Sequence, residues 1–179
     1  MIRAFCAIRP PEAACDRLED LALRLDEGRA VPWENLHLTL GFLGEAPAPE
    51  MEDVALELER VAAEAPEVAI EGVGVFGGRV PRSAHARVRP DARLSRLAAQ
   101  VRRAARRGGR ELPRERFVPH VTVARFTGRA PAGARLARWL EREKGFACAP
   151  FRAARFGLWR SELTASGPIY TEVMAVPLE

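Results

Sequence analysis

The stretches His37-Leu38-Thr39-Leu40 and His120-Val121-Thr122-Val123 repeat one pattern, 83 residues apart. On a β-strand successive side chains alternate between the two faces, so His and Thr of each stretch share one face and their apolar neighbours share the other. Each stretch therefore presents an imidazole and a hydroxyl about 7 Å apart over an apolar backing. Two such stretches at matching places in a short chain indicate one site assembled from two halves.

The elements around these stretches also repeat, in the order strand, helix, motif strand, helix, strand. In the first half the pattern predicts strands over 2–8, 36–43 and 68–76, with helices over 15–25 and 51–65. In the second half it predicts strands over 83–89, 117–126, 151–159 and 169–176, with helices over 94–105 and 131–140. We therefore expect an α+β fold in which residues 1–179 form a single bilobal domain. Its pseudo-twofold duplicated lobes would place two antiparallel sheets across a central cleft, with helices outside.

Composition limits the class of protein. The chain has 179 residues and is 47% hydrophobic, which is enough for a sizeable core, and no run approaches the roughly 20 apolar residues of a membrane span. The N-terminus lacks a basic and apolar signal pattern. Cys6, Cys15 and Cys148 are odd in number and widely spaced, which predicts buried free thiols and a cytoplasmic location.

The charge of the chain comes almost entirely from arginine. The net charge is +4, and of the 28 basic residues only Lys144 is a lysine. Two interpretations stay open: a bias of the genome, or a use of the planar guanidinium to bind two phosphate oxygens at once.

The paired residue types suit phosphodiester chemistry. Two imidazoles with near-neutral pKa values can act as general base and general acid together, while two hydroxyls donate to phosphate oxygens as negative charge develops. Solvent-facing His and Thr on half-buried strands are one alternative. A zinc site is another, but Thr is a poor zinc ligand and His85 is the only further histidine. We therefore expect no metal and no cofactor.

Longer stretches around the motifs resemble a known family. They are Arg3-Ala-Phe-Cys-Ala-Ile8, Val31-Pro-Trp33-Glu-Asn-Leu-His-Leu-Thr-Leu40 with Phe42-Leu43-Gly44, Phe117-Val-Pro-His-Val-Thr-Val-Ala-Arg125, and Leu158-Trp-Arg-Ser-Glu-Leu163 with Tyr170-Thr171. In combination they resemble the two-histidine phosphoesterase superfamily, and within it the bacterial 2'-5' RNA ligase, or RNA 2',3'-cyclic phosphodiesterase, family.

The resemblance implies a V-shaped cleft and metal-free opening of an RNA 2',3'-cyclic phosphate to a 2'-phosphate, with 2'-5' ligation as a side activity. It makes His37 the proton donor and His120 the proton acceptor, and gives Thr39 and Thr122 the task of orienting the phosphate. The expected partners are RNA ends with a cyclic phosphate or related nucleotides. We expect no membrane partner, and a monomer.

Six further residues are candidates for substrate binding. Arg114 and Arg116 precede the second motif, and Arg125 follows it, although strand alternation puts Arg125 on the core side unless the strand bulges. Trp33 and Tyr170 fit either a core role or a platform for base stacking. His85 stands where the family often has a large apolar or aromatic residue, and either stacks on a base or serves the structure. The arginines at 102, 103, 106 and 107 form either an RNA-binding strip or a solvated helix face.

Two other functions compete with RNA-end hydrolysis. The first is a sister activity on a small cyclic nucleotide or on ADP-ribose cyclic phosphate, which the dependence on substrate length would distinguish. The second is a non-catalytic module that binds RNA ends. The intact His and Thr pairs argue against the second, because a binding protein needs no acid–base pair.

Overall fold

A computed structural model describes residues 1–113, 115–127, 133–165 and 167–179. The first half contains β1 (Ile2–Ile8), α1 (Glu12–Leu23), β2 (Arg29–Ala30), the 3-10 helix η1 (Trp33–Asn35), β3 (Leu38–Ala46), α2 (Ala48–Glu59), β4 (Glu67–Val68) and β5 (Ile70–Phe76). The second half contains β6 (Ser83–Val88), α3 (Ala92–Arg107), β7 (His120–Arg125), α4 (Ala134–Arg142), β8 (Phe151–Arg152), β9 (Arg155–Thr164) and β10 (Gly167–Pro177).

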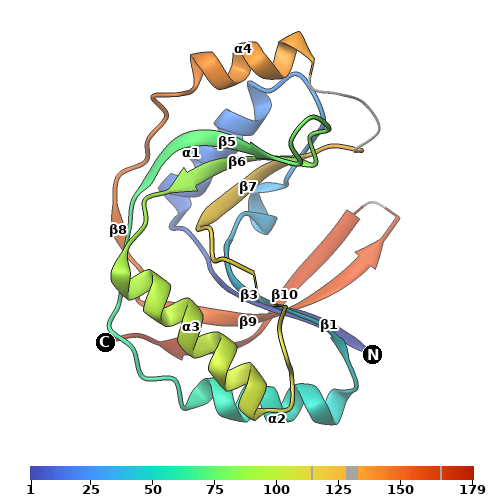
Figure 1. Cartoon of the computed structure of the whole chain (residues 1–179), viewed down its shortest axis with the longest axis vertical. Helices are drawn as coiled ribbons and strands as arrows, with labels where there is room; N and C mark the ends of the chain where they lie inside the picture. Colours follow the sequence, from blue (N-terminus) through green and yellow to red (C-terminus); the bar gives the residue numbers. More distant parts are fainter. Residues whose placement is uncertain (114, 128–132, 166) are drawn as a thin grey trace.

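The strands form one large antiparallel sheet in the order β10-β9-β1-β3-β7-β6-β5, with β2 paired to β7. Figure 1 shows α2 and α3 along one end of the molecule and α1 and α4 at the other. The α+β class is confirmed. The two expected sheets are joined into one path, because β3 and β7 pair at Leu38 and Val121. A separate small sheet contains β4 and β8.

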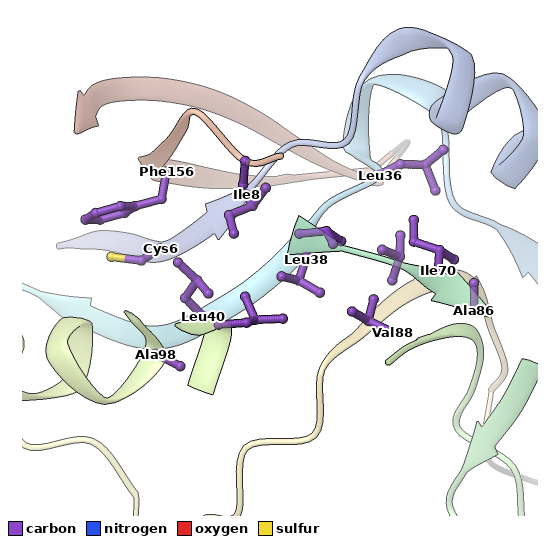
Figure 2. Close-up of a cluster of buried hydrophobic side chains, with 14 of the residues drawn as sticks. Cys6, Ile8, Leu36, Leu38, Leu40, Ile70, Ala86, Val88, Ala98 and Phe156 are labelled. Atoms are coloured by element: carbon purple, nitrogen blue, oxygen red, sulfur yellow. The ribbon is translucent and has the colours of Figure 1, made fainter. Parts of the chain in front are cut away.

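The core lies on the side of the sheet that the apolar motif residues were expected to face. Leu38, Val121 and Val123 are fully buried, and Leu40 is nearly so. Figure 2 shows Leu38 in one cluster with Ile8 of β1 and Ile70 of β5 in the first half, and with Val88 of β6 in the second half. Both halves therefore share one core, and the paired strands β3 and β7 both contribute side chains to it.

Helix α3 forms for local reasons that the sequence displays. The Asp91 carboxylate accepts a hydrogen bond from the Leu94 amide at 2.8 Å, which caps the first turn. Arg106 and Arg107 lie in the last turn, where positive charge interacts favourably with the negative end of the helix dipole, and Gly108 is the C-cap. These contacts fix the two ends of the helix.

The arginines of α3 lie away from the His and Thr face. The apolar side of α3 joins the core that contains Leu38 and Leu40, so the helix covers the opposite face of β3 from Thr39. Arg107 binds Glu57, and Arg102 donates to the Pro113 carbonyl. This placement favours the interpretation of a solvated helix face.

Cys6, Cys15 and Cys148 are free and buried, as expected. Burial raises the pKa of Cys6 to about 12 and that of Cys15 to about 11, which keeps both thiols protonated. In the part of the chain that the structure describes, no helix is long and apolar enough to cross a membrane.

Candidate active site at the crossing of the two motif strands

The two His-x-Thr stretches meet where β3 pairs with β7. In this antiparallel pair Leu38 lies opposite Val121. His37 therefore lies across from Thr122, and Thr39 lies across from His120. Because Leu38 and Val121 both point into the core, their neighbours point to the other face. One backbone pairing thus gathers all four side chains on one face of the sheet.

The same short hydrogen bond orients both imidazoles. Nδ1 of His37 lies 2.6 Å from the Asn35 carbonyl oxygen, and Nδ1 of His120 lies 2.7 Å from that of Val118. A carbonyl only accepts, so each Nδ1 carries the proton and donates it. Nε2 of each ring is then the nitrogen that can accept a proton. His37 itself lies between η1, which ends at Asn35, and β3, which begins at Leu38, rather than inside a strand from residue 36 as expected.

Aromatic rings pack against both imidazoles. The His37 ring lies 4.6 Å from Phe5 and 5.3 Å from Tyr170, measured between ring centroids. Burial is the main cause that lowers the pKa of His37, to about 4, and the charges of Arg125 and His120 lower it further. Burial likewise lowers the pKa of His120, with a further contribution from Arg125. Both rings are therefore neutral in the free protein at pH 7.

A bulge brings Arg125 onto the His and Thr face, against the expectation from simple alternation. The register of β6 with β7 pairs His85 with Thr122 but Ser83 with Arg125, so Val123 is an extra residue on β7. Ser83 and His85 share one face of β6, and their partners therefore do as well. Arg125 consequently joins Thr122 beside the histidines.

A pocket of about 310 Å³ opens beside this group. His37, Thr122, Arg125 and Tyr170 all line it, together with Arg29 of β2. Arg29 lies directly opposite Arg125 in the β2–β7 pair. Both side chains are exposed, and neither has a carboxylate partner within the described ranges. Like charges placed opposite each other on a sheet are unfavourable, so this pair is suited to an anion.

The remaining candidates from the sequence occupy different places. Trp33 donates from Nε1 to Asp16 at 2.8 Å, and the Arg9 guanidinium covers its ring, which favours an anchoring role. Arg116 is exposed and does not line the pocket. Arg114 lies outside the described residues. His85 is only 5% exposed and stacks on Phe76, so it offers no free face to a base.

Several residues of the site escaped sequence reasoning. Asn35 is one: its carbonyl orients His37, and its amide donates to the Pro168 carbonyl at 2.8 Å, which ties η1 to β10. Arg29 and the rings of Phe5 and Phe76 are the others. Phe5 and Asn35 lie within stretches that carry the family resemblance, so position in those stretches was the available signal. Arg29 stands in no motif.

Among the residues that the structure describes, histidine, cysteine and carboxylate side chains do not cluster in a way that suggests a metal site. Across residues 1–113, 115–127, 133–165 and 167–179, no three of them lie close enough together to hold an ion.

Duplicated halves that bring paired His-x-Thr stretches together are the arrangement of the two-histidine phosphoesterases. The model of the 2'-5' RNA ligase superfamily matches residues 10–165, and the chain belongs to this superfamily.

Relatives and solved structures extend this similarity over nearly the whole chain. An RNA 2',3'-cyclic phosphodiesterase of Archaeoglobus fulgidus is 32% identical, over 96% of this chain and 98% of the relative. One from Geobacillus stearothermophilus is 34% identical over 81% of this chain, which spans about half (46%) of that relative's length. The crystal structure of E. coli LigT complexed with 3'-AMP superposes with a TM-score of 0.78 at 25% identity, covering 99% and 98% of the two chains.

Proposed function

We propose that this chain hydrolyses the 2',3'-cyclic phosphate at the end of an RNA to a 2'-phosphomonoester. The observation that carries the proposal is the crossing at Leu38 and Val121, which sets each catalytic His across from the Thr of the other motif. The relatives named RNA 2',3'-cyclic phosphodiesterase support the same activity. The same site would join RNA ends through a 2'-5' bond if the 5'-hydroxyl of a second RNA took the place of water in the attack on the cyclic phosphate, with the same loss of the bond from phosphorus to the 3' oxygen.

In the proposed mechanism His120 is the base and His37 the acid. Nε2 of His120 takes a proton from water as the water oxygen bonds to phosphorus. The bond from phosphorus to the 3' oxygen breaks, and Nε2 of His37 gives that oxygen its proton, while the 2' ester bond stays intact. The Thr39 and Thr122 hydroxyls donate to the non-bridging oxygens, which carry the most negative charge in the transition state.

The protonation of His37 depends on the substrate. With a pKa of about 4, His37 is neutral in the free protein near pH 7 and has no proton on Nε2 to give. A bound phosphodiester brings a negative charge, which favours the charged imidazolium and raises its pKa. Substrate binding therefore favours protonation of His37, the acid. Because Nδ1 of His120 donates its proton to the Val118 carbonyl, Nε2 of His120 is unprotonated and can accept a proton.

Arg29 and Arg125 supply the positive charge for the substrate phosphate. Their side chains lie opposite each other on β2 and β7 and line the pocket that contains His37. A phosphate between them relieves the repulsion of the two guanidinium groups and accepts hydrogen bonds from both.

Replacement of Arg29 by Gln is expected to raise KM about 10-fold, because a hydrogen bond to a charged group contributes roughly 1.5–3 kcal/mol. The slope of log affinity against log salt should fall by about 0.7 for single-stranded RNA, as one phosphate contact is lost. Steady-state kinetics and binding at several salt concentrations measure both effects. Arg103→Gln is the matched control, since Arg103 is exposed on α3, away from the cleft. Equal behaviour of the two variants would remove Arg29 from the site.

The proposal is tested by incubating the protein with an RNA that ends in a 2',3'-cyclic phosphate, in the presence of EDTA. We expect full turnover in EDTA and a product whose only phosphomonoester is at the 2' position. A 3'-phosphate product, or activity lost in EDTA and regained with zinc, would contradict it. A mononucleoside cyclic phosphate and ADP-ribose cyclic phosphate, assayed in parallel, test the sister activities. Binding without turnover would indicate the RNA-end-binding module.

The proposal also includes the setting of the reaction. Residues 1–179 would act as one bilobal domain and as a monomer in the cytoplasm. The family match over residues 10–165 supports a single domain, and the three buried free thiols fit a reducing compartment.

A further inference from the structure

His85 is a titratable residue beside the active site that the proposed mechanism does not use. It lies on β6, opposite Thr122 of β7, and its side chain is 5% exposed. Its ring stacks on Phe76, with centroids 4.1 Å apart and planes at 22°. The same ring meets the His120 ring at 5.2 Å and 63°. Phe76 also contacts His120, at 4.7 Å, so His85 and Phe76 form a two-ring wall against that imidazole.

The ring of His85 occupies space that is open only because residue 74 is a glycine. Gly74 of β5 lies opposite it, and a Cβ on Gly74 would lie 2.6 Å from Nε2 of His85 and 2.9 Å from Nε of Arg87. No other residue type leaves that space, because every other side chain begins with a Cβ. The imidazole therefore packs closely against the backbone of β5 at Gly74, with Nε2 and Cε1 nearest to it.

The arrangement around His120 repeats the one around His37. His37 contacts Phe5, on the neighbouring strand β1, and Tyr170, on the edge strand β10. His120 contacts His85, on the neighbouring strand β6, and Phe76, on the edge strand β5. His85 thus has the place in its half that Phe5 has in the other. A flat ring at this place is common to both halves.

We infer that His85 is a positioning residue for His120: its ring, seated on Gly74 and backed by Phe76, holds the imidazole of His120 in plane and keeps water from one side of it. The inference rests on the proposed function only in giving His120 a catalytic role. A hydrogen bond from Nδ1 to Val118 fixes one edge of His120, and the two-ring wall fixes its tilt. A misplaced base loses rate, because proton transfer requires close alignment.

The charges near His85 keep its ring neutral. Burial lowers the pKa of His85 to about 4, and His120 on β7 and Arg87 on its own strand lower it further. Gly74 and Phe76 of β5 bring no charge. Nδ1 of His85 is buried and has no hydrogen-bond partner within the described residues, so no bond favours the charged form. At neutral pH His120 therefore faces two uncharged rings.

The test is an NMR titration of the ring protons, which is simple because the chain contains three histidines. In His85→Ala water reaches His120, so we expect its pKa to rise toward the ordinary value of about 6.5. The kcat should fall on the order of 10-fold with KM nearly unchanged. In His85→Phe, which copies Phe5 of the other half, both quantities should stay close to those of the unmodified protein. His37 is the internal control: its own surroundings are unchanged and only the charge of His120 reaches it, so its pKa should move far less than that of His120 in either variant.

Three outcomes would overturn the inference. The first is an unchanged His120 pKa in His85→Ala. The second is a shift of the His37 pKa as large as that of His120. The third is a loss of kcat in His85→Phe as large as in His85→Ala. Val88→Ala controls for lost packing, because Val88 lies on the same strand but in the core. It should lower thermal stability and leave the His120 pKa in place. If His85→Ala does not fold, Gly74→Ala replaces it, since the added Cβ displaces the ring and should change the pKa of His120 far more than that of His37. The titration needs no RNA, so it stands apart from the test of hydrolysis.

Discussion

Replacement of His37 or His120 by Ala is expected to lower kcat by about 10²–10⁴, because each change removes one of the two groups that move a proton in the transition state. Neither change should unfold the protein. Both side chains are partly exposed and lie on the face away from the core. Rapid-quench or steady-state assays on a cyclic-phosphate RNA give the rate, and thermal denaturation reports the fold.

The double variant His37→Ala/His120→Ala separates a concerted pair from two independent groups. If the two imidazoles act in one step, the double variant should lose far less than the product of the single losses. Near-normal turnover in either single variant would exclude the two-histidine mechanism. A loss of rate accompanied by a large loss of thermal stability would instead assign that histidine a structural role.

Replacement of Thr39 or Thr122 by Val is expected to lower kcat by about 10²–10³. Val keeps the branched shape of Thr and removes only the hydroxyl, and loss of one donor to developing negative charge typically has this effect. The register makes the prediction specific, since Thr39 lies across from His120 and Thr122 from His37. Each hydroxyl is therefore placed to donate to the phosphate while the opposite histidine moves a proton, His120 from the attacking water and His37 to the leaving oxygen. Single-turnover kinetics at saturating substrate isolate the chemical step.

Two controls accompany these variants. Thr39→Ser and Thr122→Ser retain the hydroxyl and should keep most of the rate. Thr171→Val changes an exposed threonine on β10 that lies outside the pocket, and should have no effect. If both motif threonines tolerate Val, their role is to fill the strand surface, and the oxyanion is stabilised by the arginines alone.

The sequence predicted what depends on short-range signals. Alternation placed His37 and Thr39 on one face and Leu38 and Leu40 in the core, and Asp91 and Gly108 marked the two ends of α3. These predictions hold because a strand or a helix cap involves residues only a few positions apart. The elements and their class followed, although the single strands expected over 68–76 and 151–159 are each divided in two.

Predictions that required knowledge of strand partners were less successful. Simple alternation placed Arg125 toward the core, but the extra residue Val123 returns it to the cleft face. That bulge is a property of the pairing between β6 and β7, and β7 taken by itself contains no glycine or proline that would mark it. The stacking role considered for Trp33 depended in the same way on Arg9 and Asp16, which lie elsewhere in the sequence and occupy its ring and its nitrogen.

The sequence by itself determined the groups that we propose to react, which are two histidines and two threonines, and the order of strands and helices that presents them. Only the tertiary structure decided how they meet. The pairing of Leu38 with Val121 sets His37 across from Thr122, Arg29 lies opposite Arg125, and His85 fits over Gly74 against His120. Each of these contacts joins residues that are distant in the chain or belong to different strands. Their register is selected by burial of one shared core, and no local pattern encodes it.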